Sequence, residues 1–186
     1  MKRMIVTLVG LMVTFVTARA QELPFEKGSW VLQPTVSFIN GDEGFFGDTV
    51  EGGSMHLGLG YYFDDGWGAY VSVAGYHMDQ HDADADVDGG GFDLMLRWHF
   101  LRREHWTVFI DGGGGLVRFD GEFPAFGTHS NFTARVGLGA TVRIAEDLHL
   151  IGAVRYFHLS NAARHGQDEN PSVDAVELSV GLVWEW

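Results

Sequence analysis

The chain ends with "VELSVGLVWEW", residues 176–186, in which an apolar side chain occupies every second position up to the aromatic terminus. Side chains of a β-strand alternate between two faces, so a period of two predicts a strand whose faces meet different surroundings. One face carries Val176, Leu178, Val180, Leu182, Trp184 and Trp186, whereas Glu177, Ser179 and Glu185 lie on the other. This strand therefore presents an apolar face to a hydrophobic environment.

The same alternation recurs along the chain and predicts seven more strands. The alternating stretches are residues 30–38, 55–63, 67–73, 92–100, 106–110, 132–142 and 148–156. The face opposite the apolar one carries small residues and single charges: Arg97, Asp111, Arg135, Arg155 and Glu177. Apolar residues in alternation, without helical stripes, indicate an all-β protein.

A soluble sandwich would alternate in the same way, but three features favour a membrane barrel. Aromatic residues mark strand ends, as in girdles at the two bilayer interfaces: Trp30, Phe63, Trp67, Phe100, Trp106, Trp184 and Trp186. Short connections at 64–66, 101–105 and 145–147 alternate with longer loops at 40–52, 79–90, 119–130 and 161–173, the pattern of periplasmic turns and external loops. The aromatic last residue resembles the end of many outer-membrane barrels. We therefore predict an eight-stranded antiparallel transmembrane β-barrel of the bacterial outer membrane.

The first residues, "MKRMIVTLVGLMVTFVTARA", have the organisation of a secretory signal peptide: a basic start, a short apolar run and a small-residue cleavage site. We expect a signal peptide at 1–20 and one barrel domain at 21–186. Removing the one Lys and two Arg of the signal from the formal charge of −13 leaves −16, which argues against nucleic acid as a partner. The chain has no cysteine and cannot use disulfides.

Eight strands enclose a lumen that side chains can fill. We expect the inward charges to pair with one another there, because unpaired charges away from water are costly. A filled lumen excludes the open pore of a porin. The charges also argue against an acyltransferase, which would need a lumen lined with hydrocarbon.

The stretch "RYFHLSNA", residues 155–162, places polar side chains on the lipid-facing parity of a strand. Along this strand the outward set reaches His158 and Ser160 at the external rim, next to a long loop. Alternate Cα atoms lie about 6.6 to 6.8 Å apart, so the imidazole can reach the hydroxyl two residues on. On the next strand Asp174 has outward parity, whereas Glu177 faces the lumen. A base, a nucleophile and an orienting acid thus converge, although a rim would also tolerate a solvated His and Ser.

This stretch and the last strand resemble the lipid A deacylase family of Gram-negative outer membranes, the PagL type, which removes the acyl chain ester-linked at position 3 of lipid A. Members carry Arg, then His-x-Ser-Asn-Ala near the end of the seventh strand, then an acidic residue that opens the eighth. The resemblance implies His158 as general base, Ser160 as nucleophile, Asp174 as the acid that orients the histidine, and Asn161 with the neighbouring amide of Ala162 as the oxyanion site.

The resemblance also implies a substrate and a departure from the family. The substrate is lipid A, or whole lipopolysaccharide, in the outer leaflet, and neither a metal nor an organic cofactor is required. The family has Glu where this chain has Asp174, whose carboxylate is shorter by one carbon–carbon bond, about 1.5 Å. Either the strands sit closer or the orientation of the histidine is weaker.

Other interpretations stay open from the sequence. A non-catalytic barrel with a structural or surface-interaction role is the main alternative, with Asp174 as a sign of lost activity. Arg164, in the loop after the motif, is either a contact for lipid A phosphates or a solvated residue. The stretch 79–93 contains "DADVDG", which resembles the start of a calcium loop, but the match is incomplete and favours a solvated external loop. The oligomeric state is left open.

Overall fold

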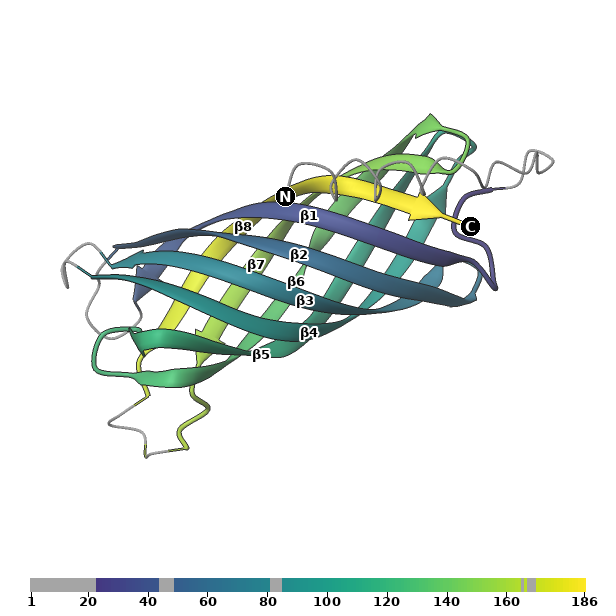
Figure 1. The fold of residues 1–186 in the computed structure, drawn as a ribbon. Helices are drawn as coiled ribbons and strands as arrows, with labels where there is room; N and C mark the ends of the chain where they lie inside the picture. The colour runs from purple at the N-terminus through teal and green to yellow at the C-terminus, as the bar shows by residue number, and fades with distance from the viewer. Residues whose placement is uncertain (1–22, 44–48, 81–84, 165, 167–169) are drawn as a thin grey trace, which may run out of the picture.

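Eight antiparallel strands form a closed barrel in the computed structural model (Figure 1). The structure describes residues 23–43, 49–80, 85–164, 166 and 170–186, so the predicted signal peptide at 1–20 lies outside the described residues. The strands are β1 (Trp30–Glu43), β2 (Thr49–Asp64), β3 (Trp67–Gln80), β4 (Ala85–Arg102), β5 (Trp106–Phe123), β6 (Thr128–Ala145), β7 (Leu148–Ser160) and β8 (Ser172–Glu185). Each pairs with its neighbours in sequence and β8 pairs with β1, which confirms the predicted fold class.

Closure joins the first strand to the last. The backbones of Trp30 and Trp186 exchange two hydrogen bonds of 3.0 Å, and along the seam Val36 lies opposite Val180. An unpaired peptide group in hydrocarbon costs several kcal/mol, so a sheet that spans a membrane has to close on itself. The closed ladder meets that requirement.

The strand faces alternate as predicted. On β8 the outward residues Val176 and Leu178 are 51 % and 50 % exposed, whereas Glu177 between them is 1 % exposed. The outer surface of the barrel is accordingly a band of aliphatic and aromatic side chains suited to lipid. No helix among the described residues is both long and apolar enough to cross a membrane.

The strands reach beyond the apolar alternation, which corrects the predicted external loops. They contain 13 to 18 residues, whereas a tilted strand needs about 9 to 11 to cross the hydrocarbon. The predicted loop 119–130 shrinks to the turn 124–127, and strands likewise occupy parts of 40–52, 79–90 and 161–173. Alternation reports contact with lipid, and it ends where the strand leaves the membrane, although backbone pairing continues.

The acidic stretch 79–93 is largely strand, so the expectation of a loop is wrong for its described part, although Asp86 and Asp88 are exposed to solvent as expected. Residues 85–93 belong to β4, while 81–84 lie outside the described residues. Asp88 pairs with His77 on β3 at 2.9 Å. An extended backbone cannot wrap around a cation, and the described part of the chain holds no cluster of three or more His, Asp or Glu side chains suited to a metal.

The aromatic residues expected at two interfaces all lie at one end of the barrel, which corrects that prediction. They occupy the starts of odd-numbered strands and the ends of even-numbered ones, which meet at the same rim. There Trp67 and Trp98 stack at 5.2 Å between ring centroids, and Trp30 lies 5.0 Å from Tyr61. The predicted short turns are confirmed at this end, which marks it as periplasmic. We call the opposite end the external rim.

Side chains fill the lumen in three layers. At the periplasmic end Phe25, from the segment before β1, is fully buried and stacks on His99 with 4.2 Å between ring centroids. Charged residues occupy the middle. Below the external rim lies a buried apolar cluster that includes Phe157, Leu159 and Val173. The two apolar layers close the barrel at both ends.

Candidate active site

The ends of β7 and β8 at the external rim carry the three predicted catalytic side chains. The strand register sets His158 directly opposite Asp174 and Ser160 opposite Ser172. Next to these positions the inward side chains Phe157, Leu159 and Val173 belong to the fully buried cluster below the rim. That packing fixes the backbone on which the outward residues stand.

His158 bridges the other two residues on the outer face of the barrel. Its Nδ1 lies 2.7 Å from Asp174 Oδ1, and its Nε2 lies 3.2 Å from Ser160 Oγ. A carboxylate only accepts hydrogen bonds, so Nδ1 carries the proton and Nε2 is free to accept the serine hydroxyl proton. The donors and acceptors thus follow the order found for a nucleophile, a general base and an acid that orients the base.

The three side chains differ in their access to the surroundings. The side chains of His158 and Asp174 are 33 % and 45 % exposed, but Ser160 is only 8 % exposed although it shares their face. Strand parity predicted the face on which each residue lies. It did not predict how far the neighbours cover the serine.

Two further groups border Asp174. The hydroxyl of Tyr156 donates a hydrogen bond to the same Oδ1 that accepts from His158. On the other side, Asp42 of β1 lies opposite Asp174 in the register and is exposed. Sequence reasoning identified neither neighbour, although the outward parity of Tyr156 on the same strand was a usable signal.

The residues after Ser160 leave the strand in an unusual backbone conformation. Ala162 and Ala163 have φ values of 56° and 55°, in the left-handed region that costs a residue with a Cβ about 1 to 2 kcal/mol. The predicted oxyanion residue Asn161 is 1 % exposed, and its amide donates to Asn170 Oδ1 at 3.1 Å. That amide is therefore already engaged. Among the described residues nothing accepts from the Ala162 amide, whose role as an oxyanion donor stays a prediction.

Arg164 lies close to the serine in the loop after β7. Its guanidinium sits over the ring of Phe132, 4.4 Å from the centroid, and Phe132 is the register partner of Ser160 on β6. A second exposed arginine, Arg118, lies two strands away on β5, opposite Ser130 of β6. Positive charge at the described part of the external rim thus gathers on the side of the barrel that bears the serine.

The same three residue types also meet inside the lumen, which sequence reasoning missed. Ser54 Oγ lies 2.9 Å from His56 Nε2, and His56 Nδ1 lies 3.2 Å from Asp93 Oδ2. All three are at most 9 % exposed, and Arg135 contacts both His56 and Asp93. The histidine and the acid of the inner set are buried, whereas the side chains of His158 and Asp174 are 33 % and 45 % exposed. Exposure of the base and the acid, more than distance, separates the outer constellation from the inner one.

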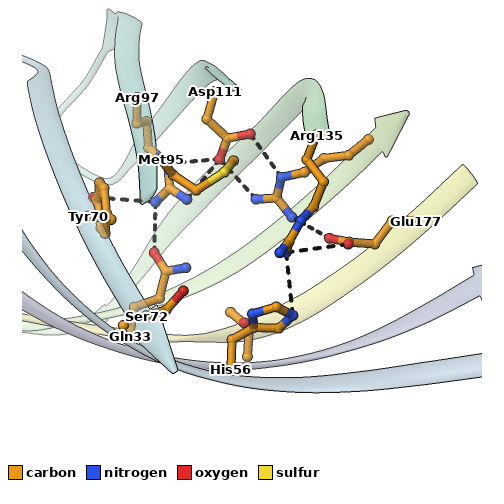
Figure 2. Close-up of a pocket in the computed structure, with 12 residues that line it drawn as sticks. Gln33, His56, Tyr70, Ser72, Met95, Arg97, Asp111, Arg135 and Glu177 are labelled. Atoms are coloured by element: carbon orange, nitrogen blue, oxygen red, sulfur yellow. Dashed lines mark hydrogen bonds and ion pairs between the residues drawn. The ribbon is translucent and has the colours of Figure 1, made fainter. Parts of the chain in front are cut away.

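The predicted pairing of the inward charges is confirmed in the middle layer (Figure 2). Asp111 accepts from Arg97 at 2.9 Å and from Arg155 at 2.8 Å, and Arg155 also reaches Glu177 at 3.0 Å. The remaining cavity among these side chains measures about 40 Å³, room for roughly three water molecules. The middle of the lumen is an ion-pair network, and neither a solute path nor a hydrocarbon-lined tunnel is present among the described residues.

Comparisons with known proteins agree with this architecture. The sequence matches the model of the outer membrane protein β-barrel domain over residues 6–185. The chain belongs to this family. Its location in the bacterial outer membrane, predicted from alternation and turn lengths, is thereby confirmed. A search among curated proteins gives no significant match.

Solved outer-membrane barrels share the fold of this family member. Neisserial surface protein A (NspA) aligns with a TM-score of 0.65 at 16 % identity, over 85 % of this chain and 99 % of that chain. OprG from Pseudomonas aeruginosa gives 0.53 at 15 % identity, over 87 % and 97 %. The outer membrane enzyme PagL gives 0.56 at 21 % identity, over 78 % and 97 %. At these identities the likeness concerns the fold alone.

Proposed function

We propose that this outer-membrane barrel is a lipid A 3-O-deacylase, a serine esterase that hydrolyses the acyl chain ester-linked at position 3. The observation that carries the proposal is the bridging position of His158, between Ser160 Oγ and Asp174 Oδ1, on the outer face of the barrel. An esterase whose substrate is a membrane lipid needs its nucleophile on the surface that the lipid touches. The sequence motif "RYFHLSNA" and the barrel shared with the outer membrane enzyme PagL support the same activity.

The chemistry follows from the polarity of the three side chains. His158 Nε2 takes the hydroxyl proton as Ser160 Oγ attacks the carbonyl carbon of the ester. Collapse of the tetrahedral intermediate breaks the bond from that carbon to the sugar oxygen, which receives the proton from His158. The same nitrogen then deprotonates a water molecule that attacks the acyl carbon; the bond from that carbon to Ser160 Oγ breaks, Oγ takes the proton back from His158, and the fatty acid is released. Asp174 holds the ring and stabilises the imidazolium in both steps.

The surroundings of the site suit an anionic lipid. Acyl chains in the outer leaflet would lie along the aliphatic wall below His158, with the sugars at the height of the rim. The exposed Arg164 and Arg118 flank this side and are placed to meet phosphate groups, to which guanidinium binds bidentately. The substrate need not leave the membrane to be cleaved.

Mass spectrometry of lipid A from cells that express the protein tests the proposal. We expect the native chain to remove one 3-hydroxyacyl group and Ser160→Ala to abolish this activity, a loss of roughly 10⁴-fold or more. Ser172→Ala is the matched control, because Ser172 lies directly opposite on the same face and makes no described contact with His158. If the native chain does not change the mass of lipid A, the alternative of a non-catalytic barrel is favoured. A gain in mass would indicate an acyltransferase.

A further inference from the structure

The hydroxyl of Tyr156 donates its hydrogen bond to the carboxylate that orients the histidine. Asp174 Oδ1 accepts from both Tyr156 Oη and His158 Nδ1, the latter at 2.7 Å. Tyr156 faces Val176 in the register and stands diagonally from Asp174. Diagonal neighbours on one face of a sheet are about 7 to 8 Å apart, which a tyrosine side chain can bridge.

The Asp174 carboxylate needs such support because little else holds it. Its side chain is 45 % exposed, and its neighbour across the seam with β1, Asp42, carries a like charge and no donor. In the described part of the molecule, the hydrogen bonds to this carboxylate come from Tyr156 and His158. A carboxylate held only by the histidine can rotate about its Cα–Cβ bond toward water and release the ring.

We propose that Tyr156 is a positioning residue that fixes the Asp174 carboxylate and, through it, the His158 ring. This inference rests on the proposed esterase. The site is then a chain of four outward side chains: Tyr156, Asp174, His158 and Ser160. The hydroxyl of Tyr156 bonds to Asp174 and, among the described contacts, not to Ser160, so its contribution enters through Asp174.

An outward tyrosine near a bilayer interface is ordinarily an anchor in the headgroup region. Tyr61 on β2 provides that comparison: it is 38 % exposed, its ring packs tilted against Trp30 with 5.0 Å between the centroids, and its hydroxyl has no hydrogen-bond partner among the described residues. The hydroxyl of Tyr156 is instead used by a carboxylate. Tyr61→Phe is therefore the matched control for Tyr156→Phe.

Kinetics on purified lipid A distinguish a positioning residue from an anchor. We expect Tyr156→Phe to lower kcat about tenfold, the usual effect of removing a group that orients a functional side chain, with KM unchanged. Asp174→Ala removes the acceptor, so Tyr156→Phe should have no further effect in that background. Losses that multiply in the double variant, an equal loss in Tyr61→Phe, or a change confined to KM would overturn the inference.

Labelling of the serine tests the inference without lipid A. A fluorophosphonate forms a bond from phosphorus to Ser160 Oγ, fluoride leaves, and His158 takes the hydroxyl proton. We expect Tyr156→Phe to slow this labelling about tenfold while Tyr61→Phe labels at the native rate; equal rates in all three overturn the inference. Normal labelling without lipid A hydrolysis would overturn the proposed substrate alone. No labelling of the native chain would overturn both.

Discussion

Two carboxylates stand side by side at the external rim, and they differ in what they touch. Asp42 and Asp174 are register partners on β1 and β8, and both are exposed and carry the same charge, but Asp174 accepts a hydrogen bond from Nδ1 of His158. We expect Asp174→Asn to lower kcat by roughly a hundredfold or more, because a neutral amide no longer stabilises the imidazolium and permits the wrong ring tautomer. Asp42→Asn, measured in the same lipid A assay, should change kcat by less than about twofold. Equal effects of the two substitutions would mean that charge at the rim, and not orientation, drives the reaction.

At this scale, strand parity predicts a face but not a contact. Counting alternate residues put His158, Ser160 and Asp174 outward and Glu177 inward, as the structure has them. The hydrogen bond from Tyr156 depends on the register between β7 and β8, which one sequence does not supply. The buried constellation around His56 could not be predicted for the same reason. Its members come from β2 and β4, and only the relative alignment of these strands brings them together.

At the scale of the element, the external end of β7 combines two tasks in alternate residues. His158 and Ser160 face outward, while Phe157 and Leu159 fill the apolar layer of the lumen. Leu159→Ala leaves a cavity there, and we expect it to lower the free energy of unfolding by about 2 to 5 kcal/mol. The catalytic rate should fall as well, because the same backbone positions the base and the nucleophile.

Unfolding by denaturant in lipid vesicles measures this effect. Leu178→Ala on β8 is the control, because Leu178 is 50 % exposed on the outer face and lipid chains can occupy the space of the missing methyl groups. A loss for Leu178→Ala as large as that for Leu159→Ala would show that the inward layer does not stiffen this strand.

The number and order of the strands could be predicted from the sequence, whereas their ends could not. Apolar alternation marks the part of each strand that meets lipid, and it located all eight. Beyond the membrane both faces are polar or packed, so the signal vanishes while hydrogen-bond pairing continues. The continued pairing extends β5 up to Phe123. In β4 it makes the stretch from Ala85, which the sequence suggested to be an acidic loop, part of the strand. Sequence alternation therefore gives a lower bound on strand length.

At the scale of the whole molecule, the sequence predicts the ion pairs in the middle of the lumen but not the apolar layers at its two ends. Single charges with inward parity have to find partners, and they do so around Asp111. The apolar layers escaped prediction because inward apolar residues such as Phe157 and Leu159 interrupt the expected polar face near the rim. The segment before β1 shows no alternation, so the sequence does not predict that Phe25 closes the periplasmic end of the lumen.

The three layers follow one another along the barrel axis, so together they block the passage of ions. An ion would have to pass the Phe25 layer, the Asp111 network and the cluster around Phe157, each of which is packed. We expect the native protein to show no stepwise conductance in planar bilayers, beside an open porin as positive control. Phe25→Ala should remain silent too, because two intact layers still block the path. Conductance steps in the native protein would contradict a sealed lumen, and steps that appear only in Phe25→Ala would mean that the periplasmic layer alone forms the seal.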